Sequence, residues 1–145
     1  MTVRRGNIGS YDADGVITLD TDYQAVALSA MDYKAREQYT EIPPYCTIRK
    51  LVIHLETVHA GASTLDFILM GGDGSDTHLK YCHEVTALTI EKDTTDTTIG
   101  VVVYDFGENG FQYTELEYCD MLASILAKVD SDTADIVSVS LEFEV

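Results

Sequence analysis

Three zinc-compatible side chains fall within six residues of one another, at His78, Cys82 and His83. A structural zinc site needs about four such ligands in tetrahedral geometry, and no fourth ligand stands nearby in the sequence. A cysteine hydrolase would instead need a thiol activated by a histidine, for which Cys82 beside His83 is the local candidate. Adjacent residues of a strand point to opposite faces, which disfavours that pair. We therefore predict no catalytic residue and no zinc site here.

Two acidic, glycine-containing segments resemble the beginnings of calcium-binding loops. Residues 71–76, GGDGSD, match the start of the calcium-binding nonapeptide repeat, but that fold is stable only when several copies stack. Residues 12–15, DADG, lack the spaced ligands and the closing glutamate of an EF-hand loop. We interpret both segments as solvated turns and predict no metal.

Composition and charge narrow the classes of function. The 145 residues suffice for one domain, and nine basic against 25 acidic side chains give a net charge of −16, which repels nucleic acid and anionic lipid. No apolar stretch is long enough to predict a membrane span or a secretory signal. Three widely separated cysteines argue against a disulfide framework and for folding in a cytoplasm. No phosphate loop, dinucleotide fingerprint or nucleophile elbow predicts a cofactor or an enzyme.

The charge is distributed unevenly along the chain. Residues 1–50 contain six basic and seven acidic side chains, whereas residues 51–145 contain three basic and 18 acidic ones. The N-terminal third is therefore near neutral, and we expect it to be the part best able to lie against another acidic surface.

Alternation of apolar and polar residues predicts strands in several places. The clearest is the C-terminal segment 136–145, IVSVSLEFEV, with one face for a core and the other for water. Residues 47–58 alternate in the same way, and the β-branched run 97–106, TTIGVVVYDF, is typical of a core strand. Residues 65–70, LDFILM, are apolar enough to predict a strand covered on both faces. Residues 107–110 should form a turn ending in the favoured pair Asn109-Gly110.

Other segments give weaker signals. Short strands are predicted at 16–19 and 85–90, and residues 23–30 fit either a strand or a short helix. Residues 113–129 carry a helical stripe with a possible capping box, Thr114 with Glu117, but residues 121–129 also alternate. We favour a strand at 121–129 and keep one short helix as the alternative.

These elements predict an all-β, single-domain antiparallel β-sandwich of jelly-roll or immunoglobulin-like kind, because six to eight strands occur without a βαβ rhythm. Residues 1–14 should form an extended N-terminal arm, since they combine glycines and arginines with isolated apolar residues. Residues 15–145 should form the sandwich domain.

The chain resembles the small β-sandwich decoration, or cement, proteins that tailed bacteriophages add to the outside of their capsids. The resemblance is carried by the arm VRRGNIGSY, the acidic strands joined by Gly/Asp/Thr loops and the terminal strand IVSVSLEFEV. It implies a non-enzymatic virion protein, made in the host cytoplasm and located on the capsid exterior. It further implies binding to the major capsid protein as a homo-oligomer, a trimer or a dimer, that stabilises the shell against internal pressure.

The near-neutral arm is the segment that we expect to contact the shell, by adding to a sheet edge or by filling a groove between subunits. The candidate contact residues are Val3, Arg4, Arg5, Ile8 and Tyr11, with the arginines pairing to carboxylates of the shell. The plain alternative is an arm that is disordered in the isolated protein.

Two other functions remain as hypotheses. The first is a ligand-binding β-sandwich of carbohydrate- or calcium-binding type, with calcium held near Asp73 and Asp76. The second is a small hydrolase built around Cys82 and His83.

Overall fold

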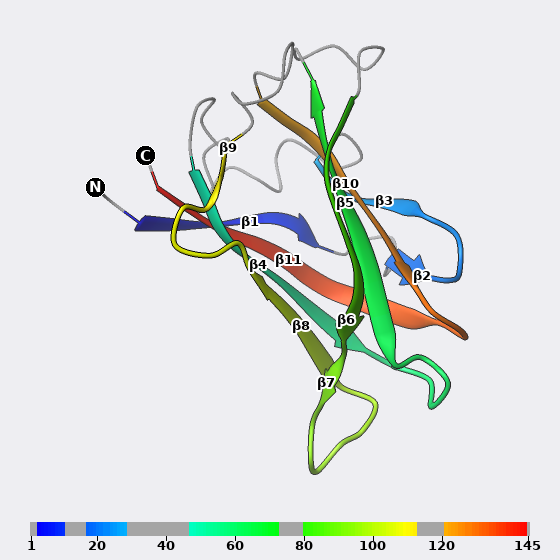
Figure 1. The fold of residues 1–145 in the computed structure, drawn as a ribbon. Coiled ribbons are helices and arrows are strands. Elements are labelled where there is room, and N and C mark those ends of the chain that lie inside the picture. The colour runs from blue at the N-terminus through cyan, green and yellow to red at the C-terminus, as the bar shows by residue number, and fades with distance from the viewer. Residues whose placement is uncertain (1–2, 11–16, 29–46, 73–79, 113–120, 145) are drawn as a thin grey trace.

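A computed structural model describes residues 3–10, 17–28, 47–72, 80–112 and 121–144. All regular secondary structure in these ranges is β-strand, and the strands form two antiparallel sheets packed as a sandwich (Figure 1). This confirms the predicted all-β class and the predicted two-layer architecture. The alternative short helix is not found in the described part of the chain, although residues 113–120 lie outside it.

The larger sheet has the order β1 (Val3–Ser10), β11 (Ala134–Glu144), β4 (Thr47–Glu56), β8 (Gly100–Asp105) and β7 (Glu91–Lys92). Two short strands join it beside this path: β2 (Ile17–Leu19) pairs with β11, and β9 (Phe111–Gln112) pairs with β4. The smaller sheet has the order β3 (Gln24–Leu28), β10 (Met121–Val129), β5 (Thr64–Gly72) and β6 (Lys80–Thr89).

The alternating segments form the centre of the larger sheet, as their pattern predicts. In β4, Leu51, Ile53 and Leu55 are buried, while His54 is exposed. Their neighbours on β11 complete the same inner face, because a two-residue period keeps each strand's apolar set on one side. The core between the sheets includes Leu51, Ile53, Leu55, Val102, Ile136, Val139 and Leu141 from the larger sheet and Leu65, Phe67, Leu69, Ile125, Ala127 and Val129 from the smaller one.

Strand β5 is buried on both faces around Ile68, as the interpretation of LDFILM expected, whereas Asp66 and Met70 on its outer face are half-buried. Leu65, Phe67 and Leu69 belong to the core between the sheets. Ile68 has the opposite orientation in the pleat and is only 1% exposed. Continuous apolar runs are what a strand covered on both sides requires.

The ambiguous segment before the last hairpin is a strand from Met121 to Val129. It pairs with β5 on one side and with β3 on the other. A strand paired on both sides places alternate residues on opposite faces, so its alternating pattern, and not the helical spacing, decides which residues are buried. The preference for a strand over a helix at 121–129 is therefore confirmed.

The N-terminal residues 3–10 are extended, and they form the edge strand β1 along β11. The backbone pairs run from Val3 opposite Glu144 to Ser10 opposite Ser138, with an irregularity between Asn7 and Gly9. The expected boundary between arm and domain, at residues 14 and 15, lies outside the described residues.

Candidate interaction surface

Four of the five residues predicted to contact a partner lie on the first strand. Val3, Arg4, Arg5 and Ile8 belong to β1, and Ile8 stands at the irregularity of its pairing with β11. Tyr11 lies outside the described residues. Among the described strands, β1 pairs with β11 alone, so the arginines stand on an edge strand of the larger sheet. Edge strands present backbone groups that another chain can pair with.

A row of alternating charge crosses four strands of the larger sheet near one end of β4. The register places Lys50 between Asp105 of β8 and Glu142 of β11. Arg5 of β1 is the next residue in the row, opposite Glu142. Opposite charges on directly opposed residues stabilise a sheet by about 0.2–1 kcal/mol per pair. By its backbone register, Arg5 therefore stands in this row of alternating residue types.

The next two rows of this outer face carry no aspartate, glutamate, lysine or arginine on β4, β8 and β11, whereas Glu91 of β7 lies opposite Val101 in the second row. Val52 lies between Val103 and Ser140 in the register, and His54 lies between Val101 and Ser138. Val103 is 49% exposed, and Ile99, which precedes β8, is 48% exposed. In a chain with a net charge of −16, this is a patch with few charges, with Glu91 at its β7 edge and large apolar side chains in solvent. We call residues Ile99, Val101, Val103, Val52 and His54, with Lys50 and Asp105, the valine face.

The valine face ends where the outer side of the same sheet becomes acidic. Glu56 and Asp135 are opposed in the next row of β4 and β11, and both are half-buried. A hydroxyl of Thr18 on β2 donates to the Asp135 carboxylate at 2.7 Å. Along the strands, the patch is therefore bounded by acidic side chains at this end and by the row of alternating charge at the other.

Aromatic rings gather at the side of the sandwich where β6 approaches β8. The His83 ring lies 5.1 Å from Phe111 and 5.5 Å from Phe106, centroid to centroid. Tyr104 stands edge-on to Phe106 at 4.8 Å and to the core residue Phe67 at 5.7 Å. Burial lowers the pKa of His83 below its ordinary value. His83 therefore lies among aromatic rings in a partly buried site, where its lowered pKa favours the neutral form.

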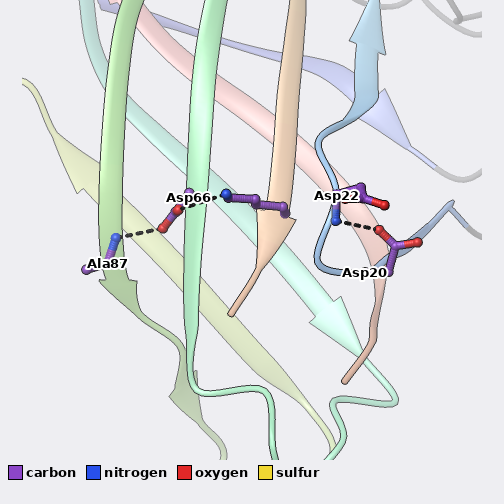
Figure 2. A network of polar contacts seen from close by, with 5 residues as sticks. Asp20, Asp22, Asp66 and Ala87 are labelled. Carbon is purple, nitrogen blue, oxygen red and sulfur yellow. Dashed lines mark hydrogen bonds and ion pairs between the residues drawn. The ribbon is translucent and has the colours of Figure 1, made fainter. Parts of the chain in front are cut away.

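The smaller sheet carries a polar network on its outer side (Figure 2). The Asp66 carboxylate accepts a hydrogen bond from the Ala87 N–H at 2.8 Å and lies 3.9 Å from the Lys128 ammonium. The Lys128 ammonium also lies 4.6 Å from the centre of the Tyr23 ring. In a separate turn of the same view, the Asp22 N–H donates to the Asp20 carboxylate at 2.8 Å. The contacts of Asp66 tie β5 to its two neighbouring strands, β6 and β10.

The loop after β7 is acidic, and its carboxylates are bound to their own backbone. Asp93 accepts hydrogen bonds from the hydroxyl and the N–H of Thr95, and Asp96 accepts the same pair from Thr98. These hydrogen bonds lower the pKa of both carboxyls, and the largest contribution comes from those that the threonine hydroxyls donate. The pattern is that of turns closed by aspartate side chains.

No cluster of three or more histidine, cysteine or acidic side chains suited to a metal ion occurs in the described residues. The described part also contains no helix with the length and apolarity to cross a bilayer. The candidate calcium segments fall largely elsewhere, since residues 73–76 and 12–15 lie outside the described ranges.

Sequence reasoning missed the valine face and the aromatic cluster. A signal for both exists in the run VVVYDF, which continues apolar side chains through consecutive positions and so places them on both faces of β8. Which residues of other strands join them depends on register, which one strand alone does not reveal.

Comparison of the chain with protein-family models, with curated proteins and with solved structures found no match. What the protein does is therefore inferred from its own residues and their geometry.

Proposed function

We propose that the chain is a non-enzymatic structural protein of a tailed-phage particle, which binds the outside of the capsid shell and stabilises it. The observation that carries the proposal is the position of the arginine-bearing strand β1 at an edge of the larger sheet. An edge strand can extend its sheet onto a partner through backbone hydrogen bonds, with alternate side chains providing specificity. The sequence resemblance to capsid decoration proteins supplies the class of partner.

The charge distribution supports this assignment of surfaces. Residues 51–145 hold 18 of the 25 acidic side chains, and an acidic exterior keeps particles soluble and mutually repelling. Arg4 and Arg5 concentrate positive charge on the strand that we assign to the shell. Arginine forms bidentate pairs with carboxylates, which suits a partner surface bearing aspartate or glutamate.

The proposal is tested by cosedimentation with capsid shells assembled from the major capsid protein of the phage or prophage that carries the gene. The protein should pellet with the shells at saturable stoichiometry and raise the temperature at which they open. Absence of binding, or a gene with no capsid gene in its genome, would overturn the proposal.

Point changes on β1 test the surface. Replacing Arg4 and Arg5 with glutamine should weaken shell binding by about tenfold or more, because carboxylates buried in the contact lose their partners. Lys92→Gln on β7 is the control, since it removes a positive charge at the opposite edge of the same sheet. Equal binding by the arginine variant and the wild type would place the contact elsewhere.

A carbohydrate-binding sandwich is the alternative, and the aromatic cluster favours it. Tyr104, Phe106 and Phe111 are each half-buried at the edge of the core. Aromatic faces can stack on sugar rings. A glycan array that gave a saturable ligand, lost on Tyr104→Ala while shell binding was absent, would establish this function instead.

A further inference from the structure

We propose that two copies of this chain associate through their valine faces, around a two-fold axis that runs parallel to the strands between β4 and β8. The proposal concerns a surface that the capsid contact does not use, because β1 lies beyond β11 from this axis. It therefore stands or fails independently of the proposed function.

The apolar residues of the valine face suit a second copy. Val52 and Val103 are opposed in register, and the two outward residues Val103 and Ile99 are about half exposed. The axis places β8 of one copy over β4 of the other, so Val103 faces Val52 of the second copy. Symmetry makes this contact twice, as an interface of one patch with itself requires.

The charged row determines the direction of the axis. Lys50 and Asp105 are opposed on β4 and β8, and the same rotation sets Lys50 over Asp105 of the second copy, also twice. A two-fold axis perpendicular to the strands would also stack Val103 on Val103, but it would set Asp105 over Val101. Charge complementarity therefore favours the axis that runs parallel to the strands.

The size of the face predicts a weak dimer. The ten residues of β4 span about 33 Å, and four strands span about 19 Å. Each copy therefore offers no more than about 600 Å², or about 1,200 Å² for the pair, which is the lower limit for stable specific interfaces. We expect a dissociation constant in the micromolar range, so that dimers form where copies are crowded.

A mixing experiment tests the geometry. In a dimer of the Lys50→Glu variant, residue 50 of each copy faces Asp105 of the other, which gives two pairs of acidic side chains. In a dimer of the Asp105→Lys variant, residue 105 of each copy faces Lys50 of the other, which gives two pairs of basic side chains. Each variant alone should dimerise about tenfold or more weakly than the wild type in sedimentation-velocity runs over a concentration series. An equimolar mixture should recover dimers, because each of the two facing pairs in the mixed dimer then joins an acidic and a basic side chain. An effect within one chain cannot produce this recovery.

Two further variants make the outcome decisive. Val103→Asp should abolish dimers, whereas Thr86→Asp, an exposed position on β6 of the other sheet, should leave them unchanged. Far-UV circular dichroism of each variant establishes that it is folded. A wild type that stays monomeric to millimolar concentration would overturn the proposal, as would dimers insensitive to Val103→Asp or a mixture that fails to recover them.

Discussion

Asp130 joins the loop after β10 to the loop before β5. Its carboxylate accepts hydrogen bonds from the Ser63 N–H at 2.9 Å, the Ser63 hydroxyl at 2.7 Å and the Thr64 N–H at 3.1 Å. Desolvation alone would raise the pKa of Asp130, but these hydrogen bonds outweigh it and lower the pKa to about 2. The negative charge of Asp130 therefore contributes to holding the two loops together.

The pH dependence of stability tests this role. The Asp130 pKa falls from an ordinary value of 3.8 on folding, so its contribution is present above about pH 4 and is lost as the pH falls toward about 2. Asp130→Asn should lower the free energy of unfolding by about 1 kcal/mol near neutral pH, since the exposed carboxylate is partly screened by solvent. Urea unfolding near neutral pH and near pH 2.5 should show the difference from wild type shrinking. Asp132→Asn in the same loop is the control, and a difference independent of pH would contradict the assignment.

Two glycines of the turn before β9 have similar backbone conformations but different surroundings. Gly107 and Gly110 both have positive φ, +89° and +64°. A Cβ on Gly107 would meet nothing within 4 Å, whereas one on Gly110 would lie 2.7 Å from the Ile48 carbonyl oxygen. The Gly110 N–H closes the turn on the Gly107 carbonyl at 3.1 Å, which confirms the turn predicted at 107–110.

Alanine substitution should therefore give unequal losses. Gly107→Ala should cost about 1 kcal/mol from the left-handed backbone alone. Gly110→Ala should cost about 2 kcal/mol or more, because the β4 backbone would also have to move. Thermal and urea unfolding of the two variants gives the comparison. Equal losses would mean that the turn can shift away from β4 freely.

At the scale of elements, an irregularity in the pairing of β5 with β6 depends on one side chain. The register shifts between Leu65 and Phe67, where Ala87 adopts a φ of 59°. Asp66 accepts the Ala87 N–H that this conformation directs toward it. The carboxylate therefore supplies an acceptor where the regular ladder is interrupted.

Removing that acceptor should cost more than removing its charge. Asp66→Ala should lower the free energy of unfolding by about 0.5–1.5 kcal/mol, because the N–H of the exposed residue Ala87 loses its protein acceptor. Asp66→Asn keeps an acceptor oxygen and loses only the distant ion pair with Lys128, so its cost should stay below about 1 kcal/mol. Urea unfolding measures both. A larger loss for asparagine would assign the role to charge instead.

The first strand shows where prediction from sequence fails. Residues 3–10 lack apolar alternation, yet they pair with β11 through the backbone, which places little demand on side chains. Deleting them would remove a strand of the larger sheet as well as the arginines. Substitution of Arg4 and Arg5 is consequently a cleaner test of partner contact than truncation.

Other strands also differ in whether their own sequence pattern predicts them or only their pairing with a distant strand defines them. The alternation of β4 and β11 predicts both strands and their buried residues because one face of each meets the core. The first half of β6 carries no such pattern, and its pairing with β5 defines it. The rows of the valine face join residues as distant as Lys50 and Asp105. Only the folded register brings them together, so this surface could not be predicted from the sequence.

At the scale of the whole molecule, the net charge of −16 sets a general electrostatic cost. Like charges repel in the compact state, and salt screens them over about 10 Å at about 0.1 M. The melting temperature should therefore rise by several degrees between about 0.02 M and about 0.5 M sodium chloride near neutral pH. Differential scanning calorimetry measures the change. A fall in melting temperature would show that favourable ion pairs outweigh the repulsion.

We propose that the protein acts through the β1 edge of its larger sheet, and hydrogen exchange on capsid shells tests this proposal most directly. An edge strand has backbone N–H groups that its own sheet does not pair, and these gain protection when a partner strand adds to it. In the shell-bound protein, amides of residues 3–10 should exchange more slowly than in the free protein, while those of β6 stay unchanged. Unchanged exchange in residues 3–10 of the bound protein, with protection confined to other strands, would contradict the claim.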